Sequence, residues 1–279
     1  MNTNSLSANM PIAVFDSGLG GLTVLKKLIE ILPNENYVYI GDNANIPYGD
    51  KSKEEIINLT LKMTDFLVEQ KCKMIIIACN TITACSYDIL KQRYNIPIIE
   101  VISNAVIDAL DKTKNNNISI MATEFTVNSN IYKNRIIKFN KQAKVTQIAC
   151  KDLCPMIENG WYSYENRLEI LKNYLESIDT NSDTLILGCT HYPHIINDIK
   201  NLLENDIRNS INNIIDPSYH TAISAKEYLK NNNLLSDNII EDYKTTIFST
   251  EKSEKINKLI NILIPKDIYK NYNIKYVNL

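Results

Sequence analysis

A faint internal repeat with a period of about half the chain constrains the fold more than any other feature of the sequence. Residues 75–81 read IIIACNT and residues 185–191 read LILGCTH, so Cys79 and Cys189 lie 110 positions apart. Residues 97–100 are echoed by residues 213–216 at a slightly larger offset. Self-similarity over so long a period indicates that the chain contains two related structural halves.

Short apolar runs alternate with helical periodicities along the chain, which is typical of an α/β protein with largely parallel sheets. Leucines recur at helical spacing from Leu22 until Pro33 ends the run, and Ser52 with Glu55 matches a helix-starting capping box. We predict ten strands, at residues 11–15, 37–40, 74–78, 97–101, 118–121, 145–149, 184–187, 213–215, 245–248 and 274–277.

The repeat divides the chain into two domains of the same class. We expect a discontinuous first α/β domain, residues 1–96 plus 212–279, and a second α/β domain, residues 97–211. Each would be a mostly parallel sheet flanked by helices, and the two would be related by a pseudo-two-fold axis. If the halves face each other, the carboxyl ends of their strands meet, and open α/β sheets bind their ligands at those ends. The active site is therefore expected between the domains.

Composition and charge limit the classes of molecule that the protein is expected to bind. The 279 residues carry a formal net charge of −2 and a sequence pI near 6.0, which provides no basic surface for nucleic acid or anionic lipid. The longest apolar runs are far shorter than the ~20 residues that span a bilayer. The first ten residues lack the pattern of a secretory signal, and the six cysteines form no compact disulfide framework. We therefore expect a cytoplasmic protein with reduced thiols and a small-molecule partner.

Cys79 and Cys189 occupy equivalent positions, each after an apolar strand and before a helix. A helix N-terminus favours a thiolate, so we expect the pKa of each thiol to fall from ~8.5 toward neutral pH. One such cysteine is often only a packing residue. A matched pair with polar neighbours indicates chemistry, because inverting a stereocentre requires one acid/base group on each face of the carbon.

Two further segments lie at predicted strand ends in the first half. Asp16 is the first residue of the segment DSGLGG. Its glycines would let the backbone approach a ligand, with an anion at the helix start, or Asp16 would only cap the helix. A dinucleotide fingerprint fails there, because its third glycine position is Thr23. Residues 41–49 form a turn-rich loop that is either an ordinary connector or a means of presenting the Tyr48 hydroxyl and backbone N–H groups to a carboxylate.

His191 lies two positions after Cys189 and is expected either to hydrogen-bond the substrate or to serve as a buried structural histidine. With His194 it forms a Cys-x-His-x-x-His pattern that suggests zinc. No matching ligand group stands out elsewhere and the spacing fits no common closed site, so we expect no metal. Among the other cysteines, we expect Cys72 and Cys85 to be packing residues and assign no role to Cys150 and Cys154.

These motifs resemble those of the glutamate racemases, in the aspartate/glutamate racemase superfamily. The resemblance runs from about residue 11 to residue 216 and is carried by residues 15–21, 41–49, 78–81, 122–126 and 188–193. It implies two α/β domains with the site between them, and no pyridoxal phosphate, other cofactor or metal. It also implies interconversion of L- and D-glutamate for peptidoglycan, and a homodimer.

Carried over to this chain, the resemblance makes Cys79 and Cys189 the paired acid/base groups, with Asp16 and His191 assisting them. Neutral hydrogen-bond donors suit a site that stabilises a carbanion-like transition state without a cofactor. The residues implied in substrate binding are Asp16, Ser17, Pro47, Tyr48, Gly49, Asn80, Thr81, Thr123, Thr126, Thr190 and His191.

Three other functions remain open at the level of the sequence. One is racemisation of aspartate or another amino acid on the same scaffold, although Cys-Thr-His at residues 189–191 looks glutamate-type. A second is a catalytically silent protein that binds an amino acid. The third is a thiol hydrolase that uses Cys189 with His191. Two positions along a strand–helix junction are poor geometry for such a pair, and Cys79 would have no role.

Overall fold

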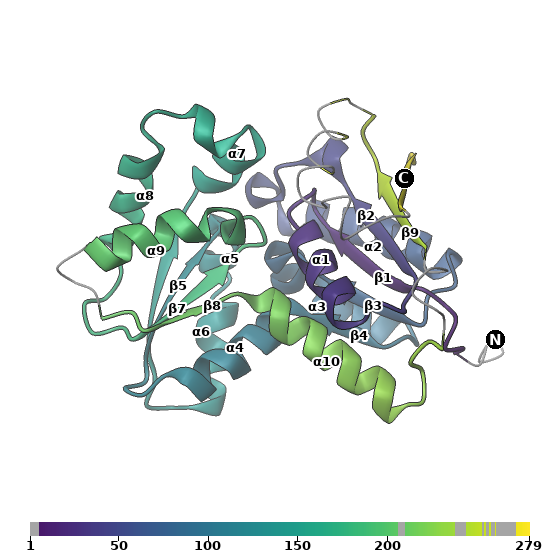
Figure 1. Ribbon diagram of the computed structural model, residues 1–279, viewed down its shortest axis with the longest axis horizontal. Helices are drawn as coiled ribbons and strands as arrows, with labels where there is room; N and C mark the ends of the chain where they lie inside the picture. The colour runs from purple at the N-terminus through teal and green to yellow at the C-terminus, as the bar shows by residue number, and fades with distance from the viewer. Residues whose placement is uncertain are drawn as a thin grey trace. The chain divides into compact units, whose positions relative to one another are not determined.

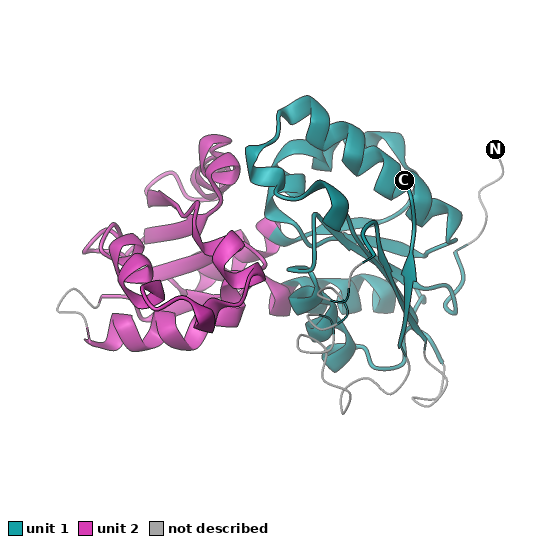
Figure 2. Cartoon of the chain, turned by 90° about the horizontal axis from the view of Figure 1, so that it is seen from above, with its two compact units in different colours: residues 1–101, 221–279 teal, residues 102–220 magenta. Residues whose placement is uncertain are grey.

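The structure is a computed structural model that describes residues 6–205, 210–237, 244–252, 254, 257, 260 and 272–279. All ten predicted strands are present, with ends that differ from the prediction by no more than two residues. The chain divides into two compact units, Met1–Val101 with Thr221–Leu279 and Ile102–His220 (Figure 2). The first unit is therefore built from two separate stretches of the chain.

The first unit contains a six-stranded sheet in the order β10-β9-β2-β1-β3-β4, and every pairing in it is parallel. Its central strands are continuous apolar runs buried on both faces, as in other parallel sheets that helices cover on both sides (Figure 1). The strands are β1 (Ile12–Asp16), β2 (Tyr37–Gly41), β3 (Met74–Ile77), β4 (Ile98–Glu100), β9 (Thr245–Ser249) and β10 (Tyr272–Tyr276), and the helices are α1 (Leu22–Ile31), α2 (Lys53–Glu69), α3 (Asn80–Arg93) and most of α10 (Pro217–Asn231).

The second unit contains a four-stranded parallel sheet in the order β6-β5-β7-β8. This is the order of β2-β1-β3-β4 in the first unit, which confirms the repeat seen in the sequence. Leu185 and Leu187 pack into a core with Leu171 and Ile199. The strands are β5 (Asn117–Ala122), β6 (Lys144–Ala149), β7 (Thr184–Gly188) and β8 (Asn213–Ile215), and the helices are α4 (Val101–Lys112), α5 (Glu124–Asn128), α6 (Ile131–Phe139), α7 (Leu153–Glu158), α8 (Arg167–Leu175) and α9 (Ile196–Asn205).

The boundaries between the units differ from the predicted ones. The sequence placed residues 97–211 in the second domain, which assigned β4 to the second domain and β8 to the first. In the structure β4 pairs with β3, and β8 pairs with β7. Strand β4 thus belongs to the sheet of the first unit and β8 to that of the second. Both boundaries therefore lie later in the chain than predicted, after Val101 and after His220.

Local signals in the sequence set the helix ends. Ser52 Oγ accepts a hydrogen bond from Glu55 N, and Glu55 Oε2 accepts one from Ser52 N at 2.9 Å, so the predicted capping box at the start of α2 is confirmed. Helix α1 ends at Ile31, two residues before Pro33, because proline cannot continue the backbone hydrogen-bond pattern.

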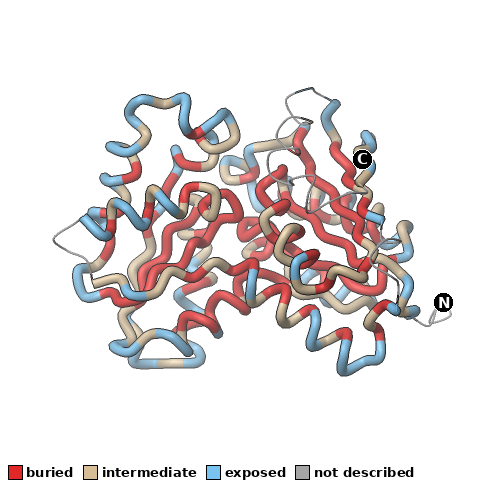
Figure 3. The backbone as a smooth tube through the Cα atoms, in the orientation of Figure 1, coloured by how far each residue is buried: buried red, intermediate tan, exposed pale blue. Residues whose placement is uncertain are grey.

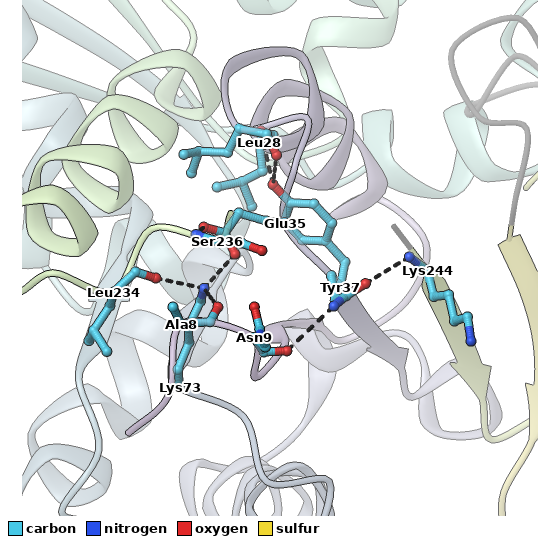
Figure 4. Close-up of polar contacts among 11 residues, drawn as sticks. Ala8, Asn9, Leu28, Glu35, Tyr37, Lys73, Leu234, Ser236 and Lys244 are labelled. Atoms are coloured by element: carbon cyan, nitrogen blue, oxygen red, sulfur yellow. Dashed lines mark hydrogen bonds and ion pairs between the residues drawn. The ribbon is translucent and has the colours of Figure 1, made fainter. Parts of the chain in front are cut away.

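A buried ion pair fastens the segment after α10 to the sheet of the first unit (Figure 4). Lys73 Nζ lies 2.5 Å from Glu35 Oε2 and donates to the carbonyl of Leu234 at 2.8 Å. Glu35 Oε1 accepts from Ser236 N at 2.9 Å. Both charged side chains are almost fully shielded from solvent. Burial lowers the pKa of Lys73, and Glu35 opposes that shift.

In both units the buried residues concentrate in the strands, and the exposed ones lie along outer helix faces and loops (Figure 3). Because the strands are buried, the packed core fixes the backbone at their ends and so positions the polar residues that follow them. Among the residues that the structure describes, no helix is both long and apolar enough to cross a membrane.

Candidate active site

In each unit the predicted site residues lie at the carboxyl ends of the strands. Asp16 is the last residue of β1, and Cys79 follows β3 by two residues. In the second sheet Thr123 directly follows β5, and Cys189 directly follows β7. Parallel strands present their carboxyl ends at one edge of a sheet. Each unit therefore carries one of the two predicted acid/base thiols in a group of polar side chains.

The Cys79 thiol caps the first turn of α3. Its Sγ atom accepts a hydrogen bond from Ile82 N at 3.5 Å and lies 3.5 Å from Ser17 Oγ. Burial raises the pKa of Cys79 well above its ordinary value, and the Asp16 carboxylate raises it further, while the bonds to Ser17 and Ile82 oppose the shift. The expectation of a lowered pKa was therefore wrong, because loss of water outweighs one long backbone bond at a helix start.

Asp16 is fully buried, and its Oδ2 accepts a hydrogen bond from Gly21 N at 2.5 Å. A Cβ atom at position 21 would stand 2.7 Å from the Cβ of Asp16 and 2.9 Å from the Cβ of Ala78. Only glycine lets the chain before α1 approach these two strand ends so closely. The glycine-rich segment therefore holds Asp16 in place beside the Cys79 thiol.

Asp42 organises the predicted loop after β2, a role that the sequence analysis did not assign to it. Its carboxylate accepts hydrogen bonds from Tyr48 OH at 2.7 Å, from Asn45 Nδ2 at 2.9 Å and from Thr250 Oγ1 at 2.7 Å. Burial and then Asp42 raise the pKa of Tyr48. The Tyr48 hydroxyl thus gives its hydrogen to Asp42, whereas one of the two interpretations of this loop had the hydroxyl presented to a ligand carboxylate.

The remaining predicted residues of the first unit lie next to these groups in the chain. Asn80 and Thr81 are buried and form the first turn of α3, directly after Cys79. Pro47 is exposed and precedes the short 3-10 helix Tyr48–Asp50, in which Gly49 is half-buried. The two turns supply backbone N–H groups and small polar side chains at the same sheet edge.

The Cys189 thiol lies within a cluster of side chains from two elements. Its Sγ atom is 3.2 Å from Cys154 Sγ in α7 and 3.5 Å from His191 Nδ1. The hydrogen bond with Cys154 and then burial raise the pKa of Cys189, while His191 opposes the shift. The predicted lowering of this pKa was therefore also wrong, since Cys189 is buried beside a second thiol and α9 begins only at Ile196.

His191 also contacts an acidic residue that sequence reasoning missed. Its Nε2 lies 2.9 Å from Glu158 Oε1. Burial opposes the charged form, but Cys189 and then Glu158 raise the pKa of His191 well above its usual range. Cys154 and Glu158 are four positions apart in α7, and residues at this spacing share one face of a helix. That spacing is the signal that would have found both residues.

The threonines predicted in the second unit flank the same strand ends. Thr123 Oγ1, at the residue before α5, lies 3.0 Å from Thr126 Oγ1, and Thr126 is fully buried within α5. Thr190 is buried directly after Cys189. Cys72 and Cys85 are buried, and their thiols donate to the backbone carbonyls of Leu67 and Lys53, in agreement with the packing role predicted for them.

The fold and the matched thiols correspond to a known class of enzymes. Residues 12–218 match the Asp/Glu/Hydantoin racemase family, so the chain belongs to that family. Within it, many glutamate racemases resemble this chain over most of its length. The enzyme from Fusobacterium nucleatum is 44% identical over 228 residues, which cover 81% of this chain and 83% of that protein.

Solved structures show the same similarity. Glutamate racemase isoform RacE1 from Bacillus anthracis superposes with a TM-score of 0.88 at 32% identity, over 98% of each chain. Glutamate racemase from Francisella tularensis, solved in complex with D-glutamate, superposes with a TM-score of 0.86 at 35% identity, also over 98% of each chain. These similarities confirm the predicted fold class of two parallel sheets flanked by helices.

Proposed function

We propose that this protein interconverts L- and D-glutamate and uses the thiols of Cys79 and Cys189 as its two acid/base groups. The observation that carries the proposal is the equivalent thiol after β3 in one unit and after β7 in the other, in a member of a racemase family. Glutamate is supported as substrate by the relatives, which are glutamate racemases, one of them solved with D-glutamate.

In this mechanism the proton moves in two balanced steps. A thiolate at one residue removes the α-proton and becomes a thiol, and the thiol of the other residue returns a proton to the opposite face and becomes a thiolate. Both sulfurs must reach the same carbon. Burial raises the pKa of Cys79, and the hydrogen bond with Cys154 and then burial raise that of Cys189, so each thiolate, once formed, is a stronger base toward the weakly acidic Cα–H bond.

The neighbours of each thiol have distinct roles in the proposal. Asp16 and Ser17 adjust the charge at Cys79, and His191 does so at Cys189 with Glu158 orienting its ring. Neutral donors hold the substrate carboxylates and stabilise the charge that develops at Cα. These donors are Ser17, Asn80, Thr81, Thr123, Thr126 and Thr190, with the backbone N–H groups of Tyr48 and Gly49 in the turn that follows Pro47.

The proposal includes the absence of any cofactor or metal requirement. It places the enzyme in the cytoplasm as a homodimer and assigns its D-glutamate to peptidoglycan synthesis. Catalysis without a cofactor rests on the acid/base groups described above, which supply every proton transfer that racemisation needs.

The test is racemisation in D2O by dialysed, chelator-treated protein. With L-glutamate we expect D-glutamate to accumulate with deuterium at Cα, and with L-aspartate we expect much slower exchange. A requirement for added pyridoxal phosphate or metal would overturn the proposal. Binding of glutamate without exchange at Cα would instead indicate a silent amino-acid-binding protein.

A further inference from the structure

Cys154, Cys189 and His191 bring two sulfurs and one ring nitrogen together in the second unit, with all three atoms within 4.8 Å of one another. Cys154 comes from α7, whereas Cys189 and His191 come from the turn after β7. We infer that this cluster is a binding site for a thiophilic divalent metal ion such as Zn²⁺, and that the bound ion inhibits the enzyme. Metal binding stands independently, while the inhibition rests on the proposed function.

The spacing of the ligand atoms is close to what a tetrahedral ion requires. With bonds of about 2.3 Å to sulfur and about 2.0 Å to nitrogen, two sulfurs stand about 3.8 Å apart and a sulfur and a nitrogen about 3.5 Å apart. The Cys154 and Cys189 Sγ atoms are 3.2 Å apart, and Cys189 Sγ is 3.5 Å from His191 Nδ1. Entry of the ion therefore requires the sulfurs to separate by about half an ångström. Cys154 is half-buried in a short helix, so its side chain is reachable from solvent.

Glu158 completes the arrangement on the far side of the histidine ring. Its Oε1 lies 2.9 Å from His191 Nε2, so Nδ1 is the nitrogen that faces the sulfurs. Metal-binding histidines commonly donate their second N–H to a carboxylate, which fixes the ring and strengthens the ligand. The carboxylate that orients His191 for proton transfer thus also suits it for metal binding.

The ligand set differs from the zinc pattern visible in the sequence. Cys-x-His-x-x-His suggests His194, which does not belong to the cluster of ligand atoms. Cys154, 35 positions before Cys189, supplies the third ligand atom instead. Three protein ligands leave one position of a tetrahedral ion for water.

Occupancy of this site removes a group that racemisation needs. Both thiols lose their protons to solvent when the metal–sulfur bonds form, and His191 binds as the neutral ring. Cys189 is then unable to donate or accept a proton. Zn²⁺ therefore acts as a reversible inhibitor and not as a cofactor.

Metal binding is tested on the reduced full-length protein with Cd²⁺, whose bonds to thiolates absorb in the near ultraviolet. We expect one tightly bound ion per chain, displaced by Zn²⁺ but not by Mg²⁺. Cys154→Val should abolish the tight absorbance change, and Glu158→Gln should weaken it by about 10–100-fold. Cys85→Val, which removes a buried thiol of the first unit, is the matched control and should bind Cd²⁺ like the wild type.

Inhibition is tested by racemase assays with Zn²⁺, each variant being compared with its own metal-free rate. We expect Zn²⁺ to inhibit the wild type and Cys85→Val, a chelator to restore both, and Cys154→Val to resist. Equal Cd²⁺ absorbance or equal Zn²⁺ sensitivity in Cys154→Val would overturn the inference. If the protein proves not to racemise glutamate, the Cd²⁺ titration still decides whether the metal site exists.

Discussion

His191 Nε2 and Glu158 Oε1 lie 2.9 Å apart, although Glu158 ends α7 and His191 lies beyond β7. The contact fixes the imidazole ring with Nδ1 at 3.5 Å from Cys189 Sγ. A carboxylate, a ring and a thiol thus form a continuous chain of polar contacts in the second unit. Because the ring is held at both nitrogens, changing the carboxylate alters the thiol through His191.

Glu158→Gln should lower the pKa of His191. In the wild type the raised pKa keeps the ring protonated above the usual range for histidine, and removing the carboxylate charge lets it lose its proton at lower pH. NMR titration of the three histidine rings measures this shift directly. Turnover should also fall, but by less than on loss of either thiol. An unchanged titration of His191 would contradict the assigned role of Glu158.

Cys79→Ser and Cys189→Ser should each abolish racemisation, with losses of about 10²–10⁴-fold or more, because a hydroxyl is too weak an acid to replace a thiol. The measurement is chiral analysis of glutamate over time. Cys85→Ser is the control, since its buried thiol bonds to the backbone carbonyl of Lys53 and to Ser86 and lies in neither group of predicted site residues. Near-normal turnover in either of the first two variants would exclude the two-thiol mechanism.

Gly21→Ala should reduce both stability and activity. The added Cβ would meet Asp16 and Ala78 at under 3.0 Å, and neither partner atom belongs to a flexible side-chain end. Overpacking of this kind costs about 1–3 kcal/mol. Denaturant unfolding and kcat are the measurements. At Gly160 the same substitution has space but a φ of +98°, so Gly160→Ala should lower stability and leave kcat nearly unchanged. Equal kcat in the two variants would argue against the positioning of Asp16 by Gly21.

Lys73→Met should destabilise the protein by about 3–5 kcal/mol, because it leaves the Glu35 carboxylate buried without its cation. The double variant Lys73→Met with Glu35→Gln should recover part of that loss, since the neutral amide tolerates burial better. Unfolding midpoints of the wild type, both single variants and the double variant give the coupling between the two residues. Additive effects would show that the pair contributes nothing as a pair.

The fold was largely predictable because the strands carry strong local signals. Continuous apolar runs such as Met74–Ile77, each followed by a polar turn, located the strands and both thiols. The domain boundaries were less accessible, because pairing of β4 with β3 is a tertiary event that leaves no local mark. The predicted strand that begins at Pro97 was placed in the second domain, whereas β4 belongs to the first unit.

The site was predictable only in part, because tertiary contacts leave no local mark in the sequence. The positions of Cys79 and Cys189 after apolar strands identified them in the sequence. Their raised pKa values depend on burial and on residues that are distant in the chain, such as Asp16 for Cys79 and Cys154 for Cys189. The sequence marks Glu158 only by its four-residue spacing from Cys154, and Asp42 only by its place in the loop after β2. Their importance comes from hydrogen bonds, such as Thr250 to Asp42 and His191 to Glu158, that form only once separate segments of the folded chain meet.

The split composition of the first unit has a consequence for how the chain is made. Strand β2 receives β9 along one side, yet residues 245–249 are synthesised only after the whole second unit, residues 102–220. During synthesis the second unit is therefore complete while the edge of β2 that pairs with β9 is still unpaired. An open strand edge is a template for pairing with other chains. Premature termination before Thr245 should accordingly yield an aggregating product, not a smaller working enzyme.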